Sequence, residues 1–589
     1  MSLKGILTPL KVWKRAFEKP YTIADPIKER PGAARYRGFH KNEIDKCVGC
    51  GSCEEICMNK TIDLIPVEGV ETKDGDSGLR PSFDYGRCCW CALCVDICPS
   101  GSLTMSNDYT WADEDADNYI FTPGVDKKKW DNEKLGYKTQ AGFSLLAPEK
   151  VKMEMLSAED GLKSFLELIK GYSKKQAITE ADRCVECGIC VATCPAHMDI
   201  PKYIAAIRED NLGLALQKLY ETNPMPATCG RICTHLCEDV CVIGLNGEPL
   251  AIRWLKRYIA DQIELSEYKN ILNDEVTLNG KKIAIIGAGP GGLSAAYYLA
   301  KLGYEITIYE RSEKAGGMIR YGVPEYRMPY NQIDKDVDYI TSLGVKIIYN
   351  TEVGKDIQFK EINEKFAAIF FSTGLVNPYD IGIEGDNFAV SGLKILDDVT
   401  KGIDPKVGEK VIVIGGGNVA MDAARTSRRL GTEVSILYRR REEDMPADLE
   451  EIHEAHAENV EFITQAIPVK IEKIADDKFK IIWNNAKMVV QENGGRPKPV
   501  AIEGDIHERI VDTIVSAIGQ AGNFEFIPKD ISEKIKFKWG KVIVNDVCQT
   551  AVKNIFAGGD IANPTADAIS AIADGHNAAK GIDGFLNKR

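Results

Sequence analysis

The sequence has no uninterrupted apolar run long enough to cross a bilayer, and its first residues lack the apolar core and small-residue cleavage site of a signal peptide. It also lacks an excess of basic residues, since its formal net charge is −13. Phosphate binding requires a basic field, so no nucleic acid partner is expected. These absences predict a cytoplasmic protein without a transmembrane segment. Thiols stay reduced in the cytoplasm, and the 18 cysteines are therefore expected to bind metal rather than to form disulfides.

A dinucleotide-binding fingerprint lies near the middle of the chain. The β-rich run 283–286 is followed by Gly287-Ala288-Gly289-Pro-Gly291-Gly292 and then by a helical pattern. Gly287 permits a tight turn, Gly289 lets the backbone approach a pyrophosphate, and Gly292 lets helix and strand pack closely. The next strand ends at Glu310-Arg311, where a carboxylate can accept hydrogen bonds from ribose hydroxyls. A glycine turn alone is weak evidence for such a site, but this order of strand, turn, helix and acidic residue indicates a dinucleotide-binding site.

A second fingerprint follows after about 130 residues, and it differs from the first at the end of its second strand. It reads Gly415-Gly-Gly417-Asn418-Val419-Ala420, and its second strand ends in Tyr438-Arg439-Arg440-Arg441 instead of an acid. Arginine can bind a ribose 2′-phosphate that a carboxylate would repel. The pattern favours NADPH over NADH, although arginines here can also contact adenine or solvent.

Two cysteine motifs near the N-terminus have the spacing of iron–sulfur ligands. They are Cys47-x-x-Cys50-x-x-Cys53-x-x-x-Cys57 and Cys88-x-x-Cys91-x-x-Cys94-x-x-x-Cys98-Pro. In two-cluster ferredoxins the fourth cysteine of each motif ligates the other cluster. The spacing therefore predicts one 4Fe-4S cluster on Cys47, Cys50, Cys53 and Cys98, and a second on Cys88, Cys91, Cys94 and Cys57. Zinc is the rival, but these are not the paired Cys-x-x-Cys groups of a zinc ribbon. With the preceding Tyr36-Arg-Gly-Phe39, this region resembles the two-cluster ferredoxin subunit of complex I and of related hydrogenases, which implies an electron relay.

A second cysteine-rich region has a different second half. Cys184-x-x-Cys187-x-x-Cys190-x-x-x-Cys194-Pro is followed by Cys229, Cys233, Cys237 and Cys241 at spacings of four residues. The region is similar to the N-terminal helical domain of the glutamate synthase small subunit and of dihydropyrimidine dehydrogenase. That resemblance implies one cluster on Cys184, Cys187, Cys190 and Cys241, and another that includes Cys194, Cys233 and Cys237.

In those relatives the last ligand of the second helical-domain cluster is a Gln or Glu, and Lys256 stands at the matching position here. An ammonium has no lone pair to offer iron. Cys229 is the nearest substitute, so we predict an all-cysteine cluster of Cys194, Cys229, Cys233 and Cys237. Four clusters then use sixteen of the cysteines and leave Cys89 and Cys548. Cys89, beside a ligand, is expected to be an inert packed thiol, with competition for the ligand register as the alternative, and Cys548 an ordinary buried residue.

Three further segments resemble the flavoprotein part of the glutamate synthase small subunit. They contain Gly316-Gly317, with the loop to Pro329; the paired crossings at Thr373-Gly374 and Ala517-Ile-Gly519; and the closing run Gly559-Asp560 to Ala568-Ile569. The second fingerprint has arginines where the first has Glu310, and this contrast assigns the first fingerprint to FAD and the second to NAD(P)H. The resemblance also implies that Asp560 binds the ribityl chain and that the helix start at 565–569 faces the flavin.

Together these motifs predict an electron-transfer subunit that works between NAD(P)H and a partner through FAD and four 4Fe-4S clusters. No acid–base dyad or nucleophile is identifiable, and hydride transfer requires none. The expected partner is a free ferredoxin or the catalytic subunit of a larger complex, such as a 2-oxoacid oxidoreductase, hydrogenase or formate dehydrogenase. The alternatives are a glutamate synthase small subunit and a non-catalytic electron wire or scaffold.

The expected fold class is multidomain α+β and α/β. It comprises a two-cluster ferredoxin fold, a helical 4Fe-4S domain and two Rossmann-like domains, the NAD(P)-binding one inserted in the FAD-binding one. The apolar spacing also predicts a helix over 158–172. The predicted divisions are an N-terminal arm (1–46), a ferredoxin domain (47–105), a linker (106–156), a helical cluster domain (157–270), an FAD-binding domain (281–376 and 515–589) and an NAD(P)H-binding domain (377–514).

Overall fold

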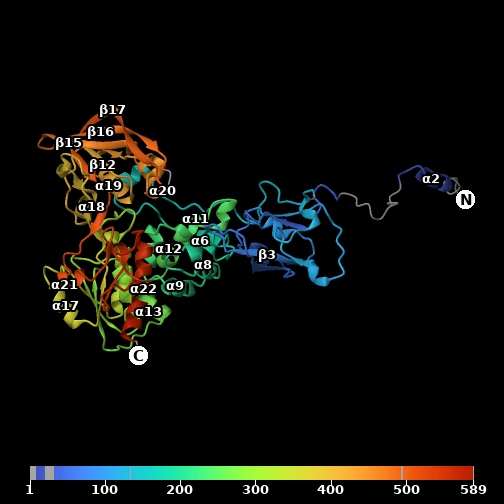
Figure 1. Cartoon of the computed structure of the whole chain (residues 1–589), viewed down its shortest axis with the longest axis horizontal. Coiled ribbons are helices and arrows are strands. Elements are labelled where there is room, and N and C mark those ends of the chain that lie inside the picture. The colour runs from blue at the N-terminus through green and yellow to red at the C-terminus, as the bar shows by residue number, and fades with distance from the viewer. Residues whose placement is uncertain (1–7, 20–31, 133, 492–494, 588–589) are drawn as a thin grey trace. The chain divides into compact units, whose positions relative to one another are not determined.

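The structure, a computed structural model, describes residues 8–19, 32–132, 134–491 and 495–587. It divides into two compact units, unit 1 (Met1–Pro148) and unit 2 (Glu149–Arg589), which are described separately (Figure 1). The predicted N-terminal arm lies partly outside the described residues; within it the structure describes α2 (Thr8–Arg15) and residues 32–46. Of the helices described, none has both the length and the apolar character needed to cross a membrane.

Unit 1 contains small antiparallel sheets and short helices around an aromatic core. Phe39 stacks on the buried Trp130 with ring centroids 4.3 Å apart, so the segment after residue 105 contributes to this core. β1 pairs with β4, and β3 pairs with both β2 and β5. The elements are β1 (His40–Asn42), α3 (Ser52–Glu55), β2 (Ile62–Pro66), β3 (Leu79–Asp84), α4 (Leu93–Asp96), β4 (Leu103–Met105), β5 (Ile120–Phe121) and the 3-10 turns Ala116–Tyr119 and Lys129–Asn132.

The first part of unit 2 is helical. Its helices are α5 (Ala158–Leu162), α6 (Lys174–Ala181), α7 (Ile189–Thr193), α8 (Ile200–Arg208), α9 (Leu212–Tyr220), α10 (Pro226–Ile232), α11 (Leu236–Asp239), α12 (Ile252–Gln262) and α13 (Leu265–Leu272). The helix predicted over 158–172 is wrong, because α5 ends at Leu162. Beyond it the chain is extended: Leu168 donates a backbone hydrogen bond to Tyr326 and accepts one from Leu156. These tertiary hydrogen bonds replace those that a longer helix would make.

A five-stranded parallel sheet follows, with strand order β22-β9-β6-β7-β8. The buried residues on one face of this sheet form a continuous core with those of the helical region, so the two parts pack together. The buried residues on its other face form a separate cluster. The strands are β6 (Lys282–Ile286), β7 (Glu305–Tyr309), β8 (Lys346–Ile348), β9 (Ala368–Phe371) and β22 (Ile555–Ala557). The helices are α14 (Pro290–Lys301), α15 (Met318–Tyr321), α16 (Tyr330–Ser342), α17 (Phe359–Lys365), α21 (Lys529–Ser532) and α22 (Ala568–Leu586).

A second five-stranded parallel sheet, of order β11-β18-β12-β13-β14, is inserted between β9 and β22 and has its own core. The two connecting segments, β10 (Leu375–Pro378) and β19 (Gln520–Gly522), pair antiparallel with each other. The inserted sheet consists of β11 (Val390–Ser391), β12 (Lys410–Ile414), β13 (Glu433–Leu437), β14 (Glu461–Ile463) and β18 (Thr513–Ser516), with helices α18 (Gly392–Thr400), α19 (Asn418–Arg429) and α20 (Leu449–Ala457).

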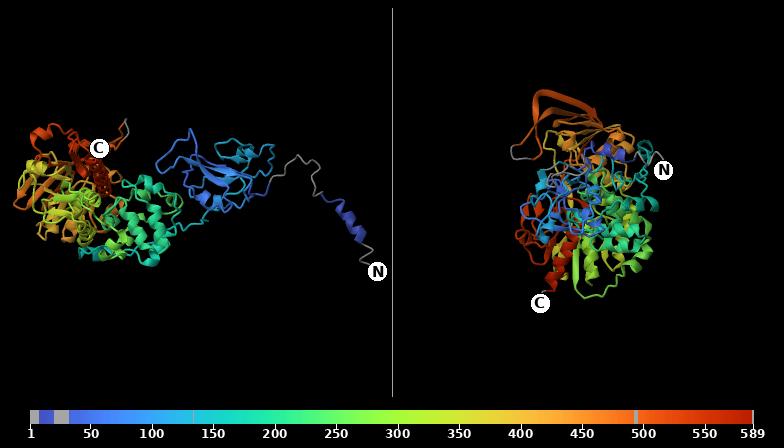
Figure 2. Two further views of the ribbon diagram at one scale, coloured as in Figure 1. Left: turned by 90° about the horizontal axis from the view of Figure 1, so that it is seen from below. Right: turned by 90° about the vertical axis from the view of Figure 1, so that its right-hand side faces the viewer.

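A three-stranded antiparallel sheet, β15 (Ala466–Ala475), β16 (Lys478–Val489) and β17 (Lys498–Val511), accompanies the inserted domain. It is the orange sheet at the top of Figure 1 and in the right-hand view of Figure 2. The two parallel α/β sheets, the helical region and the small ferredoxin-like unit confirm the predicted fold class.

Candidate cofactor and cluster sites

The turn after β6 is shaped by glycines. Gly287 has φ +103, and a Cβ placed on it would lie 2.3 Å from the carbonyl oxygen of Ser372. A Cβ on Gly292 would lie 2.0 Å from the carbonyl oxygen of Gly287, so α14 packs directly against the turn. α14 begins with Pro290 after Gly289, and its first N–H groups are left for a ligand. This turn has the shape that pyrophosphate binding requires.

Glu310 is fixed at the end of β7 and is 6% exposed. Its two carboxylate oxygens accept hydrogen bonds from the backbone N–H of Ala288, at 2.7 Å, and of Ser312, at 2.8 Å. Each oxygen retains a second lone pair, so the carboxylate can also accept from ribose hydroxyls.

A cavity of about 820 Å³ opens at the carboxyl ends of these strands. Most residues of the predicted FAD site line this cavity: Gly287, Gly289, Gly291, Glu310, Arg311, Gly317, Thr373, Gly374, Gly559, Asp560 and Ala568. Ala288, Gly292, Gly316 and Ile569 are not among its lining residues. The hydroxyl of Thr373 is buried without a hydrogen-bond partner among the described residues, and burial raises the pKa of Asp560 to about 6. An extended polar cofactor such as FAD would satisfy both groups, so the cavity fits it.

Two further sets of residues from distant segments line the same cavity. Ile232 and Thr234, on either side of Cys233, come from the helical region, and Asn418 and Val419 come from the second fingerprint. The structure therefore brings the two neighbours of a predicted cluster ligand, Cys233, and residues of both predicted dinucleotide sites to one cavity. The helix predicted to start within 565–569 begins at Ala568, where Asp567 accepts a hydrogen bond from the N–H of Ser570.

A second cavity of about 240 Å³ shares Gly287, Glu310, Arg311 and Thr373 with the first. Its other walls come from the loop after β8 (351–355) and from Asn523, Glu525 and Phe526. This continuity offers room for the adenosine end of a dinucleotide. Sequence reasoning did not find these loops because they carry no motif and meet only in the folded chain.

The second fingerprint repeats the geometry of the first. Gly415 has φ +148, and a Cβ on it would lie 2.2 Å from the carbonyl oxygen of Ala517. Gly417 precedes α19, whose first residue, Asn418, accepts a hydrogen bond from the N–H of Asp448 at 2.9 Å. Ala420 is fully buried beneath the turn, and Gly519, with φ +117, lies in the return crossing.

The three arginines after β13 have different surroundings. Arg441 is paired with Asp444 at 2.9 Å and with Glu443 at 3.1 Å. Arg440 donates from Nε to the carbonyl oxygen of Pro497, which leaves its other nitrogens for a ligand, and Arg439 is exposed. Arg439 and Arg440 are therefore the arginines available to a phosphate.

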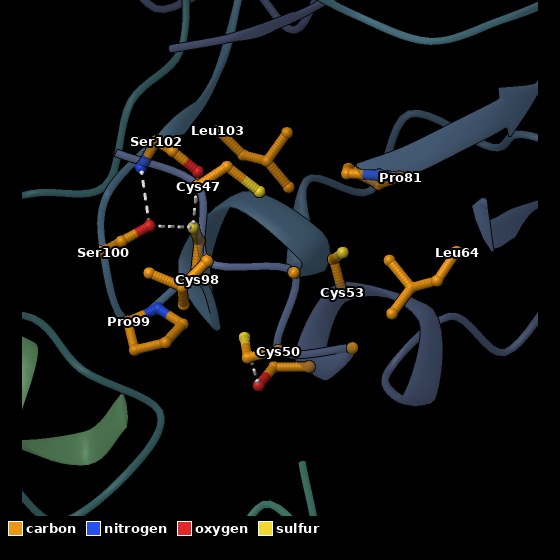
Figure 3. Close-up of a pocket in the computed structure, with 14 residues that line it drawn as sticks. Cys47, Cys50, Cys53, Leu64, Pro81, Cys98, Pro99, Ser100, Ser102 and Leu103 are labelled. Atoms are coloured by element: carbon orange, nitrogen blue, oxygen red, sulfur yellow. Dashed lines mark hydrogen bonds between the residues drawn. The ribbon is translucent and has the colours of Figure 1, made fainter. Parts of the chain in front are cut away.

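In unit 1, Cys47, Cys50, Cys53 and Cys98 line one pocket, and Figure 3 shows their side chains around it. Serine hydroxyls lie within hydrogen-bonding distance of two of the sulfurs: Ser52 is 3.3 Å from Cys50, and Ser102 is 3.4 Å from Cys98. Four sulfurs around one space form the donor set of a 4Fe-4S cluster, and hydrogen bonds to sulfur tune its potential.

The other cysteines of unit 1 also gather. Burial and the nearby thiols of Cys88, Cys91 and Cys57 raise the pKa of Cys94. The sulfur of Cys94 lies 3.2 Å from Nε2 of the buried His40, and that of Cys57 lies 3.1 Å from the hydroxyl of Thr61. Residues two positions before the third cysteine, namely Gly51, Ala92 and Gly188, share a left-handed conformation in all three Cys-x-x-Cys-x-x-Cys loops. The same loop geometry thus recurs in both units.

The helical region separates its cysteines into two groups. Cys190 is surrounded by Cys187, Cys184 and Cys241, whose thiols, together with burial, raise its pKa. Cys237 lies near Cys233 and Cys194, and the fully buried Cys229 lies near Cys233. The groups match the two predicted sets, but the ligand assignment, including Cys229, remains a prediction.

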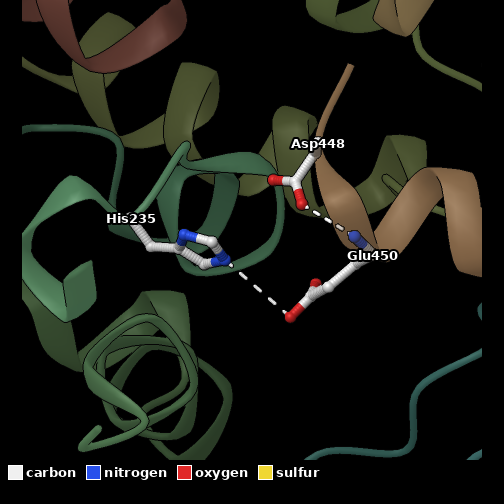
Figure 4. A group of neighbouring side chains, drawn as sticks. All are labelled: His235, Asp448 and Glu450. Atoms are coloured by element: carbon white, nitrogen blue, oxygen red, sulfur yellow. Dashed lines mark hydrogen bonds and ion pairs between the residues drawn. The ribbon is translucent and has the colours of Figure 1, made fainter. Parts of the chain in front are cut away.

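Figure 4 shows His235, from the segment between Cys233 and Cys237, beside Asp448 and Glu450 at the start of α20. Their possible ligand atoms lie within 4.8 Å of one another, yet Glu450 is already paired with Arg253 of α12. Arg327 similarly pairs with Asp422 of α19 at 2.7 Å. These contacts are best understood as ion pairs between the inserted domain and the rest of unit 2.

Three family models match this chain. Residues 281–580 match the pyridine nucleotide-disulphide oxidoreductase family, residues 161–268 match domain II of dihydropyrimidine dehydrogenase with its 4Fe-4S cluster, and residues 46–102 match a 4Fe-4S dicluster domain.

Similar proteins include three bacterial oxidoreductase subunits. The NADPH-Fe(3+) oxidoreductase subunit beta of Geobacter sulfurreducens is 35% identical over 68% of this chain and 64% of its own length. The NADP(+)-dependent formate dehydrogenase subunit beta of Moorella thermoacetica is 36% identical over 68% of this chain and 60% of its own length. The small chain of NADPH glutamate synthase from Escherichia coli is 32% identical over 72% of this chain and 94% of its own length. The chain thus spans less than two thirds of the length of the first two of these relatives.

Proposed function

The chain belongs to the pyridine nucleotide-disulphide oxidoreductase family, and we propose that it passes electrons between NAD(P)H and a partner through FAD and four 4Fe-4S clusters. The matched families make it an iron–sulfur flavoprotein NAD(P)H oxidoreductase, in agreement with the resemblance to the glutamate synthase small subunit. The number of clusters, the ligand set and the partner are parts of the proposal.

The observation that carries the proposal is the 820 Å³ cavity. FAD held there by Gly287, Glu310, Thr373 and Asp560 would supply the conversion between two-electron hydride chemistry and the one-electron chemistry of the clusters. Asn418 and Val419 bring the start of α19 to the same cavity, where they can position a nicotinamide. Ile232 and Thr234 connect the cavity to Cys233.

The residues of the site position groups and exclude water, and they need not act as acids or bases. The loop from Gly322 to Pro329 is held against the inserted domain by the Arg327–Asp422 pair, with Gly322, Val323 and Arg327 on the cavity wall. Burial raises the pKa of Asp422 to about 6, although the adjacent Arg327 guanidinium favours its charged form. This contact joins the flavin side of the cavity to the nucleotide side.

Several observations favour NADPH as the nucleotide. Arg439 and Arg440 are available at the end of β13, and no acid occupies the position that Glu310 holds in the first sheet. The Geobacter and Escherichia coli relatives are named for NADPH, and the Moorella relative for NADP(+). The relatives are also named as subunits or chains of larger enzymes, which supports a partner subunit or a ferredoxin as the other redox partner.

The second candidate is a glutamate synthase small subunit. The Escherichia coli chain favours it, because 94% of that chain is matched. The 4Fe-4S dicluster match at residues 46–102 is an additional electron-carrying region that this role does not call for. Glutamate synthesis after mixing with a large subunit would support this candidate.

The test is anaerobic purification of the native protein with whatever co-purifies, followed by assays of FAD, iron and sulfide. Four clusters predict about sixteen iron atoms per chain, since each holds four. NADPH should bleach the flavin faster than NADH. If neither NADPH nor NADH bleached the flavin, the oxidoreductase proposal would be refuted and the electron-wire alternative would be favoured.

A further inference from the structure

Lys256 is a buried lysine in the helical region, and its surroundings are unusual for a charged side chain. It lies on α12, is 4% exposed and forms no ion pair or hydrogen bond with the described residues. Burying an unpaired ammonium is costly, so a compensating negative charge is expected nearby.

The position of Lys256 follows from the way α12 packs. One turn earlier, Arg253 donates to the carbonyl oxygen of Cys233 at 3.4 Å, and its backbone N–H donates to Glu238 at 2.9 Å. Residues 253 and 256 share a helix face, because side chains three apart are neighbours. That face therefore looks onto the Cys233–Glu238 segment.

α10 reaches the same place from the other side. A Cβ on Gly230 would lie 2.6 Å from the Cα of Arg257, so the two helices touch backbone to backbone next to Cys229 and Lys256. The side chain of Lys256 lies among Cys194, Cys229, Cys233 and Cys237, and thiolates at these positions would favour its ammonium form and raise its pKa against the opposing effect of burial.

Nearby carboxylates are committed to other groups. Glu238 pairs with Lys150 at 3.0 Å and accepts from the N–H of Arg253. Asp336, on α16, accepts from the backbone N–H groups of Ala227 and Thr228 at the start of α10. Within the described residues, the negative charge left to compensate Lys256 is that of the cysteine sulfurs and of the iron–sulfur cluster that they would hold.

We propose that Lys256 is the counter-charge of the cluster bound by Cys194, Cys233 and Cys237, and that it raises the reduction potential of that cluster. The inference rests on the proposed function and deepens it. Reduction adds one electron to the cluster, breaks no bond and leaves the three protons of Lys256 in place. A fixed positive charge favours the reduced form, which carries one more negative charge. Because Ile232 and Thr234 line the flavin cavity on either side of Cys233, this cluster becomes the preferred first acceptor of electrons from the flavin.

The experiment compares the full-length wild type with Lys256→Met, Lys256→Arg and Lys335→Met by redox titration followed with electron paramagnetic resonance, alongside iron assays. Lys335 is a matched control, since its ammonium donates to the carbonyl oxygens of Ala260 and Ile263 at the end of the same helix. The charged groups around it are Asp261, Glu264, Asp336 and Arg231. In Lys256→Met one midpoint should move to lower potential, by about tenfold in the reduction equilibrium or about 59 mV for one electron. Lys256→Arg and Lys335→Met should keep the wild-type midpoints.

Unchanged midpoints in Lys256→Met with full iron content would overturn the proposal, and so would an equal shift in Lys256→Arg. Lys256→Gln repeats the neutral substitution if Lys256→Met does not retain its iron. Loss of the cluster in the Met, Gln and Arg variants alike would also overturn it, because charge would then not be what the site requires. Failure of the underlying function is distinguishable, since it would appear in the wild type as missing iron or as a flavin that NADPH does not bleach.

Discussion

Arg439 and Arg440 provide a direct test of how the nucleotide is selected. Both follow β13, where the first sheet has Glu310, and neither is paired with a carboxylate among the described side chains. Replacing them with alanine removes the groups available to a 2′-phosphate and leaves the remaining parts of a dinucleotide untouched. The double variant should therefore lose affinity for NADPH and keep its affinity for NADH.

The size of the effect follows from the solvent exposure of the two side chains. A hydrogen bond to a charged group contributes about 1.5–3 kcal/mol. Arg439 is exposed and Arg440 is half-buried, so both belong at the low end of that range. Since about 1.4 kcal/mol corresponds to a factor of ten, each single variant should lower kcat/KM for NADPH about tenfold and the double variant about a hundredfold.

The assay is anaerobic stopped-flow measurement of flavin bleaching by NADPH and by NADH over a range of concentrations. Arg441→Ala is the matched control, because Arg441 is already paired with Glu443 and Asp444. This variant should leave the ratio of kcat/KM for NADPH to kcat/KM for NADH unchanged. Equal losses with both nucleotides, or an effect of Arg441→Ala as large as that of Arg439→Ala, would refute the reasoning.

Gly287→Ala should abolish FAD binding, because the new Cβ would lie 2.3 Å from the Ser372 carbonyl oxygen. The flavin absorbance per protein measures this loss. Gly344→Ala is the control for backbone strain alone, since Gly344 has φ +92 and a Cβ there would have no atom within 4 Å. Cys229→Ser should remove the iron of one cluster whereas Cys548→Ser should not, and an unchanged iron count and spectrum in the former would exclude Cys229 as a ligand. Burial and Lys580 lower the pKa of His576 from 6.5 to about 4, so the unfolded chain binds a proton in this interval that the folded chain does not. The free energy of unfolding should therefore fall as the pH decreases from 6.5 towards 4. His576→Phe, which retains a ring against Tyr298, should remove this dependence when unfolding by denaturant is measured at each pH. Equal pH dependence in the wild type and the variant would contradict the role of His576.

The parts of the site that the sequence predicts well are those set by consecutive residues. Gly287, Gly289 and Glu310 belong to one strand–turn–helix–strand unit, and that unit forms wherever its own glycines and apolar residues allow. The cysteine loops behave similarly, because Gly51, Ala92 and Gly188 fix the same backbone turn locally. For this reason the spacing alone places their sulfurs close together.

The parts that could not be predicted depend on distant segments meeting. Nothing in the sequence around Cys233 indicates that Ile232 and Thr234 line the same cavity as Gly287, because that depends on the packing of α10 and the first sheet. The helix expected over 158–172 failed for a related reason. Its apolar spacing included Leu166, which is 70% exposed, while the backbone of Leu168 binds Tyr326. Tertiary hydrogen bonds outweighed the local pattern.

The distribution of hydrophobic cores within unit 2 bears on the relative rates of hydride transfer and single-electron transfer. The helical region and the first parallel sheet share one core, whereas the inserted domain has its own. The inserted domain is joined to the rest of unit 2 by the paired β10 and β19 and by ion pairs such as Arg327–Asp422, which would have to open if it turned. A rotation of the inserted domain about these strands would move the nicotinamide relative to the flavin but would leave the separation of flavin and Cys233 unchanged. Hydride delivery would then be gated by the inserted domain, whereas single electrons would pass from a flavin to a cluster at Cys233 over a fixed distance.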